Sequence, residues 1–97
     1  MAKVRWTIQA SEDLESIAQF IAKDSSYYAH LFIVDIFRAV DQLAEFPKLG
    51  RVVPESCNPS IRELILRNYR LVYRLKEDWI ELLTVYHGSR LLDPLQL

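Results

Sequence analysis

The apolar residues of this chain follow two periods, one typical of strands and one typical of helices. Residues 3–9, KVRWTIQ, alternate between apolar and polar side chains and predict a half-buried strand. Residues 10–23 change to the period of an amphipathic helix, for which Ser11 is the expected N-cap. After a break at residues 24–26, a longer helix is expected to end before Pro47. Because the break is short, the two helices should pack as an antiparallel hairpin.

The C-terminal half predicts three strands, at residues 61–66, 69–75 and 79–87. The segment before them, residues 47–60, is rich in proline and is expected to be a loop. In the turn between the first two of these strands, Asn68 is the residue expected to tolerate a positive φ. No helical pattern separates the strands, so they should form an antiparallel meander. The order β-α-α-β-β-β predicts an α+β fold, in which a helical hairpin packs on one face of a small, mainly antiparallel sheet.

The turn at residues 77–78 sets the expected pairing of the last two strands. It places Arg74 opposite Glu81, a favourable cross-strand pair. The same uninterrupted register places Arg70 opposite Val85, without an acidic neighbour. The face expected to pack against the helices carries Tyr69, Leu71, Tyr73, Leu75, Ile80, Leu82, Thr84 and Tyr86. The opposite face, expected to be uncovered, carries Arg70, Val72, Arg74, Glu81, Leu83, Val85 and His87.

The arginines on the uncovered face allow two interpretations, a solvated sheet surface or a site for an anionic or acidic partner. We expect Arg70, His87 and Arg90 to form a target-binding site, because they meet at one end of the sheet. Arg74 is expected to be structural, since Glu81 neutralises it. Glu81 should lie about 20 Å from His87 along their strand, so these two residues cannot act as an acid–base pair on one bond. The sequence therefore predicts an anion-binding surface and identifies no catalytic residue.

Length and composition narrow the classes of protein that remain. The 97 residues fit a single domain, and the net charge of −1, from 12 basic and 13 acidic residues, lacks the basic excess of proteins that hold many phosphates. The two histidines and the single cysteine, Cys57, are dispersed, so no metal or other cofactor is expected. With one cysteine, no visible signal peptide and no apolar run of about 20 residues, we expect a cytoplasmic protein without membrane contact.

Two groups of apolar residues exceed what a single core requires. The group in the second helix is either extra core near the start of that helix or part of a contiguous surface for a partner protein, and the group in the tail is expected to belong to the same surface. The residues concerned are Leu31, Phe32 and Val34 in the helix and Leu91, Leu92, Leu95 and Leu97 in the tail.

Several motifs, spread in order over nearly the whole chain, resemble those of the ParE/RelE toxin superfamily. They are the opening strand, ASEDLESIAQFIA, LAEFPKLGR, YRLVYRL and LLTVYHGSR. The resemblance implies a β-α-α-β-β-β fold, a cytoplasmic location and the role of toxin in a type II toxin–antitoxin module, of the kind that stabilises plasmids. It also implies a cognate antitoxin that neutralises the toxin in a hetero-oligomer, for which the surplus apolar residues named above are the expected contacts.

The superfamily contains two activities, and the departures of this sequence favour one of them. RelE-like members cleave mRNA on the ribosome, and ParE-like members poison DNA gyrase. Arg70 matches a phosphate-contacting catalytic position of RelE-like members, and Arg90 matches an arginine with a similar role. The functional tyrosine that follows in RelE-like nucleases is absent from LLDPLQL, and the strand IRELIL lacks lysines. We therefore expect a ParE-like toxin that acts on DNA gyrase. The alternatives are a RelE-like, ribosome-dependent mRNA endoribonuclease and a non-catalytic antitoxin-binding module.

Overall fold

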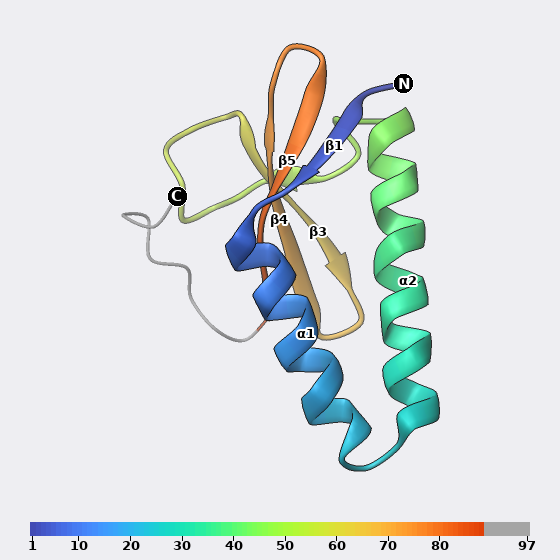
Figure 1. The fold of residues 1–97 in the computed structure, drawn as a ribbon. Coiled ribbons are helices and arrows are strands. Elements are labelled where there is room, and N and C mark those ends of the chain that lie inside the picture. Colours follow the sequence, from blue (N-terminus) through green and yellow to red (C-terminus); the bar gives the residue numbers. More distant parts are fainter. Residues whose placement is uncertain (89–97) are drawn as a thin grey trace.

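A computed structural model of the chain describes residues 1–88, in which two antiparallel helices cover one face of a five-stranded sheet (Figure 1). The predicted α+β fold and the predicted order of elements are confirmed, and a short strand is added within the expected loop. The elements are β1 (Lys3–Trp6), α1 (Ile8–Ala22), α2 (Ser26–Glu45), β2 (Arg51–Val52), β3 (Ile61–Leu66), β4 (Tyr69–Leu75) and β5 (Trp79–His87).

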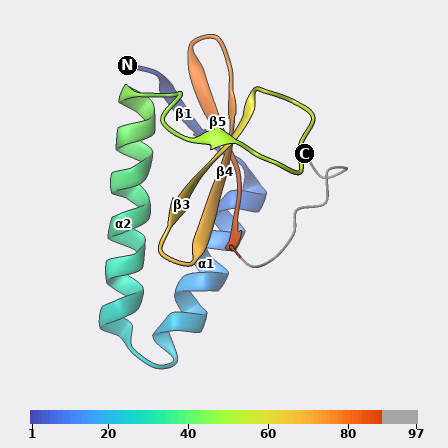
Figure 2. The ribbon, with the colours of Figure 1, turned by 180° about the vertical axis from the view of Figure 1, so that it is seen from behind.

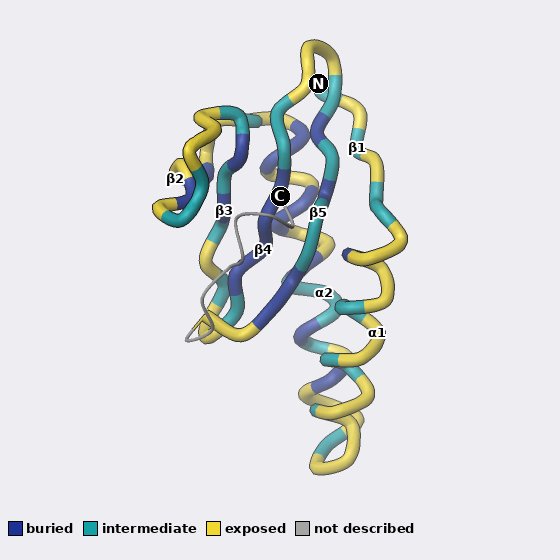
Figure 3. The backbone as a smooth tube through the Cα atoms, turned by 90° about the vertical axis from the view of Figure 1, so that its left-hand side faces the viewer, coloured by how far each residue is buried: buried dark blue, intermediate teal, exposed yellow. Residues whose placement is uncertain are grey.

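The strands lie in the order β1-β5-β4-β3-β2, so the first and last strands of the chain are neighbours. β1 runs parallel to β5, with Val4 opposite Ile80, and every other neighbouring pair is antiparallel. Figure 3 shows that, among the strands, β4 and β5 carry the most buried residues, and each of them has a strand on both sides. None of the helices that the structure describes combines the length and hydrophobicity needed to cross a bilayer.

The first helix begins earlier than the sequence pattern predicts. Thr7, and not Ser11, is the N-cap, because its side chain accepts a hydrogen bond from the backbone N–H of Ala10 at 3.1 Å. The Thr7 hydroxyl also donates to the carbonyl of Leu82 in β5 at 2.7 Å, which attaches the helix start to the sheet. Ile8, which falls within the predicted strand at residues 3–9, instead lies on the first turn of α1 and is 78% exposed.

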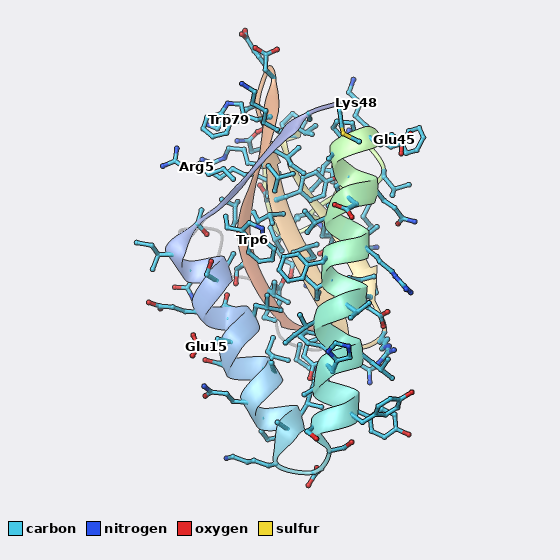
Figure 4. The ribbon with its side chains drawn as sticks, turned by 45° about the vertical axis from the view of Figure 1, so that its right-hand side comes forward. Arg5, Trp6, Glu15, Glu45, Lys48 and Trp79 are labelled. Atoms are coloured by element: carbon cyan, nitrogen blue, oxygen red, sulfur yellow. The ribbon has the colours of Figure 1, made fainter. Side chains whose placement is uncertain are left out.

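The helical hairpin supplies one side of the main core. Phe32 is 3% exposed, and its ring centroid lies 5.1 Å from that of Tyr69 in β4. Phe37 of α2 is 48% exposed, and its ring centroid lies 5.6 Å from that of Trp6. Figure 4 shows Trp6 on the strand that α1 and α2 flank, with Arg5 and Trp79 together near one end of the sheet. The buried residues of α2 are Ala29, Phe32, Ile36, Ala39, Val40, Leu43 and Ala44.

The predicted register between β4 and β5 is correct near their turn and wrong beyond it. Arg74 lies opposite Glu81 as expected, but a bulge between Val72 and Tyr73 shifts the remaining pairs by one residue. Arg70 therefore lies opposite Tyr86 and not opposite Val85. The shift also exchanges faces, because residues that lie opposite each other share a face. Val85 joins the core beneath the helices, and Tyr86 joins the cluster on the other face.

Asp13 of α1 explains why the bulge forms where it does. Its carboxylate accepts hydrogen bonds from the Thr84 hydroxyl and from the backbone N–H of Val85, the latter at 3.2 Å. A bulge removes backbone groups from the strand ladder, and buried N–H groups must find another acceptor. Asp13 supplies that acceptor from the helix packed above β5.

The face opposite the helices is partly covered, contrary to the prediction. Val53, Ile61, Val72 and Tyr86 form a second buried cluster there, with Leu83 packed against it. Val53 belongs to the segment that follows β2, and Figure 2 shows this segment on the side of the strands away from α2. The expected loop thus acts as a cover for the polar side of the sheet.

Tyr73 anchors the start of this covering segment. Its hydroxyl donates to the carbonyl of Pro47 at 2.8 Å and accepts from the backbone N–H of Gly50 at 2.9 Å. Any Cβ at Gly50 would lie 2.5 Å from the carbonyl oxygen of Glu63, so the close approach requires glycine. Burial raises the pKa of the Tyr73 hydroxyl above its ordinary value, which keeps it protonated as a donor.

The turn between β3 and β4 places its positive φ, 56°, at Arg67 and not at Asn68. The guanidinium of Arg67 forms an ion pair with Asp35 of α2 at 2.6 Å, so the turn is tied to the helical layer.

Removal of the Asp13 carboxylate should destabilise the bulge. We expect Asp13→Ala to lower the free energy of unfolding by about 1–3 kcal/mol, because the Val85 N–H loses its acceptor. The exposed neighbour Glu12 provides the control, and Glu12→Ala should cost less than about 0.5 kcal/mol. Urea unfolding measures both. Equal losses in the two variants would show that the bulge does not depend on Asp13.

Candidate functional site

Two carboxylates enclose the guanidinium of Arg70 on the face opposite the helices. The Arg70 side chain is 7% exposed, and its Nε donates to Glu63. Its Nη1 and Nη2 donate to the two carboxylate oxygens of Glu55 at 2.9 and 2.8 Å, which is the planar, bidentate geometry of a strong ion pair. The expectation that Arg70 lacks an acidic neighbour is therefore wrong.

Glu63 links two arginines across three strands. Its side chain is fully buried, and one oxygen accepts from Arg70 while the other accepts from Nε and Nη2 of Arg51, both at 2.7 Å. The short strand β2 explains the second contact, because it places Arg51 directly opposite Glu63. A buried carboxylate is tolerated only when cations and hydrogen bonds compensate its lost hydration, and Arg70 and Arg51 provide both.

Glu55 approaches Arg70 from the covering segment. Val53, two residues earlier, is buried, and its N–H donates to the carbonyl of Ile61 at 3.1 Å. The N–H of Ser56 donates to the carbonyl of Val53 at 3.1 Å, which forms a turn around Glu55. This turn holds the Glu55 backbone so that its side chain, 18% exposed, reaches Arg70.

The surroundings of Arg70 keep it charged and fixed. The hydrogen bond with Glu55 raises the pKa of the Arg70 guanidinium above its ordinary value, against the opposite effect of burial, and Glu63 adds to the increase. The Tyr86 ring, brought to this face by the bulge, lies 5.1 Å from the guanidinium carbon. Arg51 and Arg70 together balance the charges of Glu55 and Glu63.

A depression of about 330 Å³ opens beside this cluster. It brings together two of the predicted site residues, Arg70 and His87, whereas Arg90 lies outside the described residues. His87 lies opposite Tyr69 and contacts its ring at 5.7 Å, so it is on the other side of β5 from the predicted one and reaches the depression from the end of the sheet. Among residues 1–88, the lining residues are Arg51, Ile65, Arg67, Asn68, Arg70, His87 and Gly88.

The predicted pair between Arg74 and Glu81 is confirmed, with an N–O distance of 3.6 Å. Glu81 lies six positions before His87 on β5, so it does not contribute to the depression. Within residues 1–88, no group of three or more histidine, cysteine or acidic side chains is placed to hold a metal ion. Three arginines, Arg51, Arg67 and Arg70, line the depression, and guanidinium groups can bind anionic groups.

Sequence reasoning missed Arg51, Glu55 and Glu63. Glu63 could have been found from the sequence, because a tight turn at residues 67–68 places Ile65 opposite Arg70, and Glu63 lies two positions beyond Ile65 on the same face. No sequence pattern places Arg51 or Glu55 beside Arg70. Both residues lie in a segment whose position depends on the contacts of Tyr73 and Val53.

The predicted partner surface divides into three parts. Phe32 packs in the core between the helices and the sheet, so it does not belong to a partner surface. Leu31 and Val34 are half-buried on α2. Leu91, Leu92, Leu95 and Leu97 lie outside the described residues. Close to Leu31, the rings of Tyr27 and Tyr28 contact each other and are 65% and 59% exposed.

Comparison with known proteins gives a consistent set of relatives. Residues 4–92 match the family described as ParE toxin of the type II toxin–antitoxin system parDE. The protein Y4kP of Sinorhizobium fredii is 40% identical over 90 residues, 91% of this chain and 90% of Y4kP. The toxin RelE2 of Caulobacter vibrioides is 30% identical over 92 residues, 94% of this chain and 100% of RelE2. A chain from the solved chromosomal ParDE toxin–antitoxin system of P. aeruginosa has a TM-score of 0.72 at 26% identity, covering 90% of this chain and 96% of that chain.

The two strand arginines should differ sharply in their effect on stability. We expect Arg70→Ala to lower the free energy of unfolding by about 3 kcal/mol or more, because it removes a cation from a buried carboxylate. Arg74→Ala breaks a more exposed pair and should cost about 0–1 kcal/mol. Urea unfolding of both variants checks this difference, and comparable losses would contradict the structural role of Arg70.

Proposed function

Because the chain belongs to the ParE toxin family of type II toxin–antitoxin systems, we propose that it arrests growth through DNA gyrase and is neutralised by a cognate antitoxin. The observation that supports gyrase over mRNA is the enclosure of Arg70 by Glu55 and Glu63. Cleavage of the RelE-like kind would need Arg70 at a phosphate. In this chain the Nη edge of Arg70, which would make that contact, already binds a carboxylate.

The charge of the chain supports a protein target. Proteins that bind nucleic acid through several phosphates carry clusters of Lys and Arg that are not paired with acidic side chains. Here the net charge is −1, and the arginines nearest the depression face Glu55, Glu63 and Asp35. A surface in which arginines alternate with carboxylates and aromatic rings is better suited to a protein interface.

We place the target-facing surface at the depression. Arg51, Arg67, Arg70 and His87 are among the residues that line it. Arg90 remains part of the proposed surface on sequence grounds alone. The half-exposed side chains of Arg51 and Arg67 reach outward, at 60% and 55% exposure, so they are available to contact a partner.

For the antitoxin, we propose contacts on the helical hairpin. Leu31 and Val34 lie on α2 beside the exposed pair Tyr27 and Tyr28. An apolar groove of about 580 Å³ also runs between the two helices, with Phe37 in its lining. An amphipathic antitoxin segment would bury such residues, and contiguous exposed apolar surface of this kind is typical of partner binding. The tail residues Leu91, Leu92 and Leu95 remain in this proposal from the sequence.

A second candidate is ribosome-dependent mRNA cleavage, which is favoured by the similarity to the toxin RelE2. This activity requires Arg70 to break its ion pair with Glu55, so that the guanidinium can contact a phosphate. A third candidate, a non-catalytic module that only binds the antitoxin, would be distinguished by the absence of any growth defect.

The proposed target can be tested with the purified chain. We expect it to inhibit supercoiling by DNA gyrase and to trap broken DNA, and to leave mRNA uncut on translating ribosomes. Supercoiling assays and primer extension on ribosome-bound mRNA measure these activities. Codon-specific cuts that are lost in Arg70→Lys, which retains a cation in the buried pair, would establish the second candidate instead.

The same chain expressed in cells provides the control for toxicity. Its induction alone should arrest growth, and co-induction of the neighbouring gene should restore growth. If induction at high soluble level has no effect, the chain is a binding module and the proposed function is wrong.

A further inference from the structure

We propose that the free edge of β1 binds an extended segment of a partner protein in which acidic and apolar side chains alternate. β1 is the terminal strand of the sheet, so within residues 1–88 it is paired only on the side toward β5. Figure 3 shows β1 at the margin of the sheet opposite β2. This edge is a different surface from the depression and from the groove between the helices, and its test does not depend on the identity of the toxin's target.

The backbone of β1 presents both donors and acceptors at this edge. The N–H groups of Lys3 and Thr7 donate to backbone carbonyls on the β5 side, both at 3.1 Å, so these positions face β5. Since the backbone groups of a strand point alternately to its two sides, those of Val4 and Trp6 point away from β5. No strand of the described chain lies on that side. A peptide strand can pair with such N–H and C=O groups, whereas a phosphate backbone supplies acceptors alone.

The polar side chains of β1 favour an acidic partner strand. Lys3 and Arg5 are exposed, and neither forms an ion pair within residues 1–88. Arg5 points away from α2, and its guanidinium carbon lies 5.4 Å from the centroid of the Trp79 ring (Figure 4). Glu81 lies opposite Arg5 in register, but its carboxylate pairs with Arg74. Carboxylates placed opposite Lys3 and Arg5 on an added strand would form favourable cross-strand pairs.

The other face of β1 favours apolar side chains at the alternate positions. Val4 and Trp6 pack against the main core and are only half-buried. The ring of Trp6 lies 5.6 Å from that of Phe37, which is 48% exposed on α2, so apolar surface continues from the strand onto the helix. Apolar residues of an added strand would cover this surface and extend the core. The partner segment therefore has a period of two, with acidic residues on one face and apolar residues on the other.

The same charges disfavour pairing of β1 with a second copy of the chain. In such a dimer, Lys3 and Arg5 of both copies would lie on neighbouring strands, where like charges repel. Basic side chains on edge strands are a common protection against association of sheets. At β1 this protection acts against another basic edge and not against an acidic one, so the edge selects its partner by charge.

Nuclear magnetic resonance can test this edge with a synthetic nine-residue peptide, in which Glu alternates with Val, as the probe. We expect the peptide to shift the resonances of β1 and to slow hydrogen exchange at the amides of Val4 and Trp6, because these N–H groups gain acceptors. The same peptide with every amide N-methylated keeps its charge and loses its donors. It should bind about tenfold more weakly, since the hydrogen bonds to the β1 carbonyls are lost.

Variants of the chain test the role of charge. The double variant Lys3→Gln, Arg5→Gln should bind the acidic peptide about tenfold more weakly, since two exposed ion pairs are lost. Lys23→Gln is the matched control, because Lys23 is exposed at the end of α1, and it should leave peptide binding unchanged. The amide spectrum of β5 verifies that each variant retains the sheet.

Three results would overturn the proposal. Equal binding of the N-methylated peptide would show that charge alone attracts the peptide, without addition of a strand. Absence of any shift in β1 at millimolar peptide would show that Lys3 and Arg5 only protect the edge. Stronger binding of a single-stranded oligonucleotide than of the peptide, at matched ionic strength, would assign this surface to nucleic acid.

Discussion

The buried carboxylate of Glu63 is the constraint on which the polar side of this sheet depends. A charge with no exposed surface, placed between two strands, must be matched by cations nearby. Arg70 supplies one from β4, and β2, only two residues long, supplies the other through Arg51. The segment that carries β2 is held by Tyr73 and Val53, and it also brings Glu55 to the remaining edge of Arg70.

This cluster is connected to the helical layer through the bulge in β5. Asp13 of α1 accepts the N–H of Val85, and the shift that follows turns Tyr86 toward Arg70. Without the bulge, Val85 would occupy the position of the aromatic ring. A residue of the first helix therefore determines what lies beneath the guanidinium on the opposite face of the sheet. The architecture of this ParE family toxin makes its two faces interdependent, although each has its own apolar cluster.

The features that the sequence predicted correctly are those determined by nearby residues. The three C-terminal strands, the helical hairpin and the pair between Arg74 and Glu81 follow from local period and one tight turn. The register failed beyond Tyr73 because the bulge depends on Asp13, a residue distant in sequence. The ion pair of Arg70 with Glu55 could not be predicted either, because contacts between residues distant in sequence determine where the segment after β2 runs. Arg70 and His87 do line one depression, as the sequence predicts, but the expectation that Arg70 lacks an acidic neighbour is wrong.

A double-mutant cycle on Arg70 and Glu63 tests the dependence on the buried charge most directly. Arg70→Met and Glu63→Leu should each lower the free energy of unfolding by about 3 kcal/mol or more, because each removes one of the opposite charges that compensate a buried ionic group. The double variant leaves only Arg51 and Glu55, whose side chains reach solvent. The free energy of unfolding of the double variant, measured in urea, should decrease by at least about 2 kcal/mol less than the sum of the two single decreases. Additive losses would contradict the central role of this ion pair.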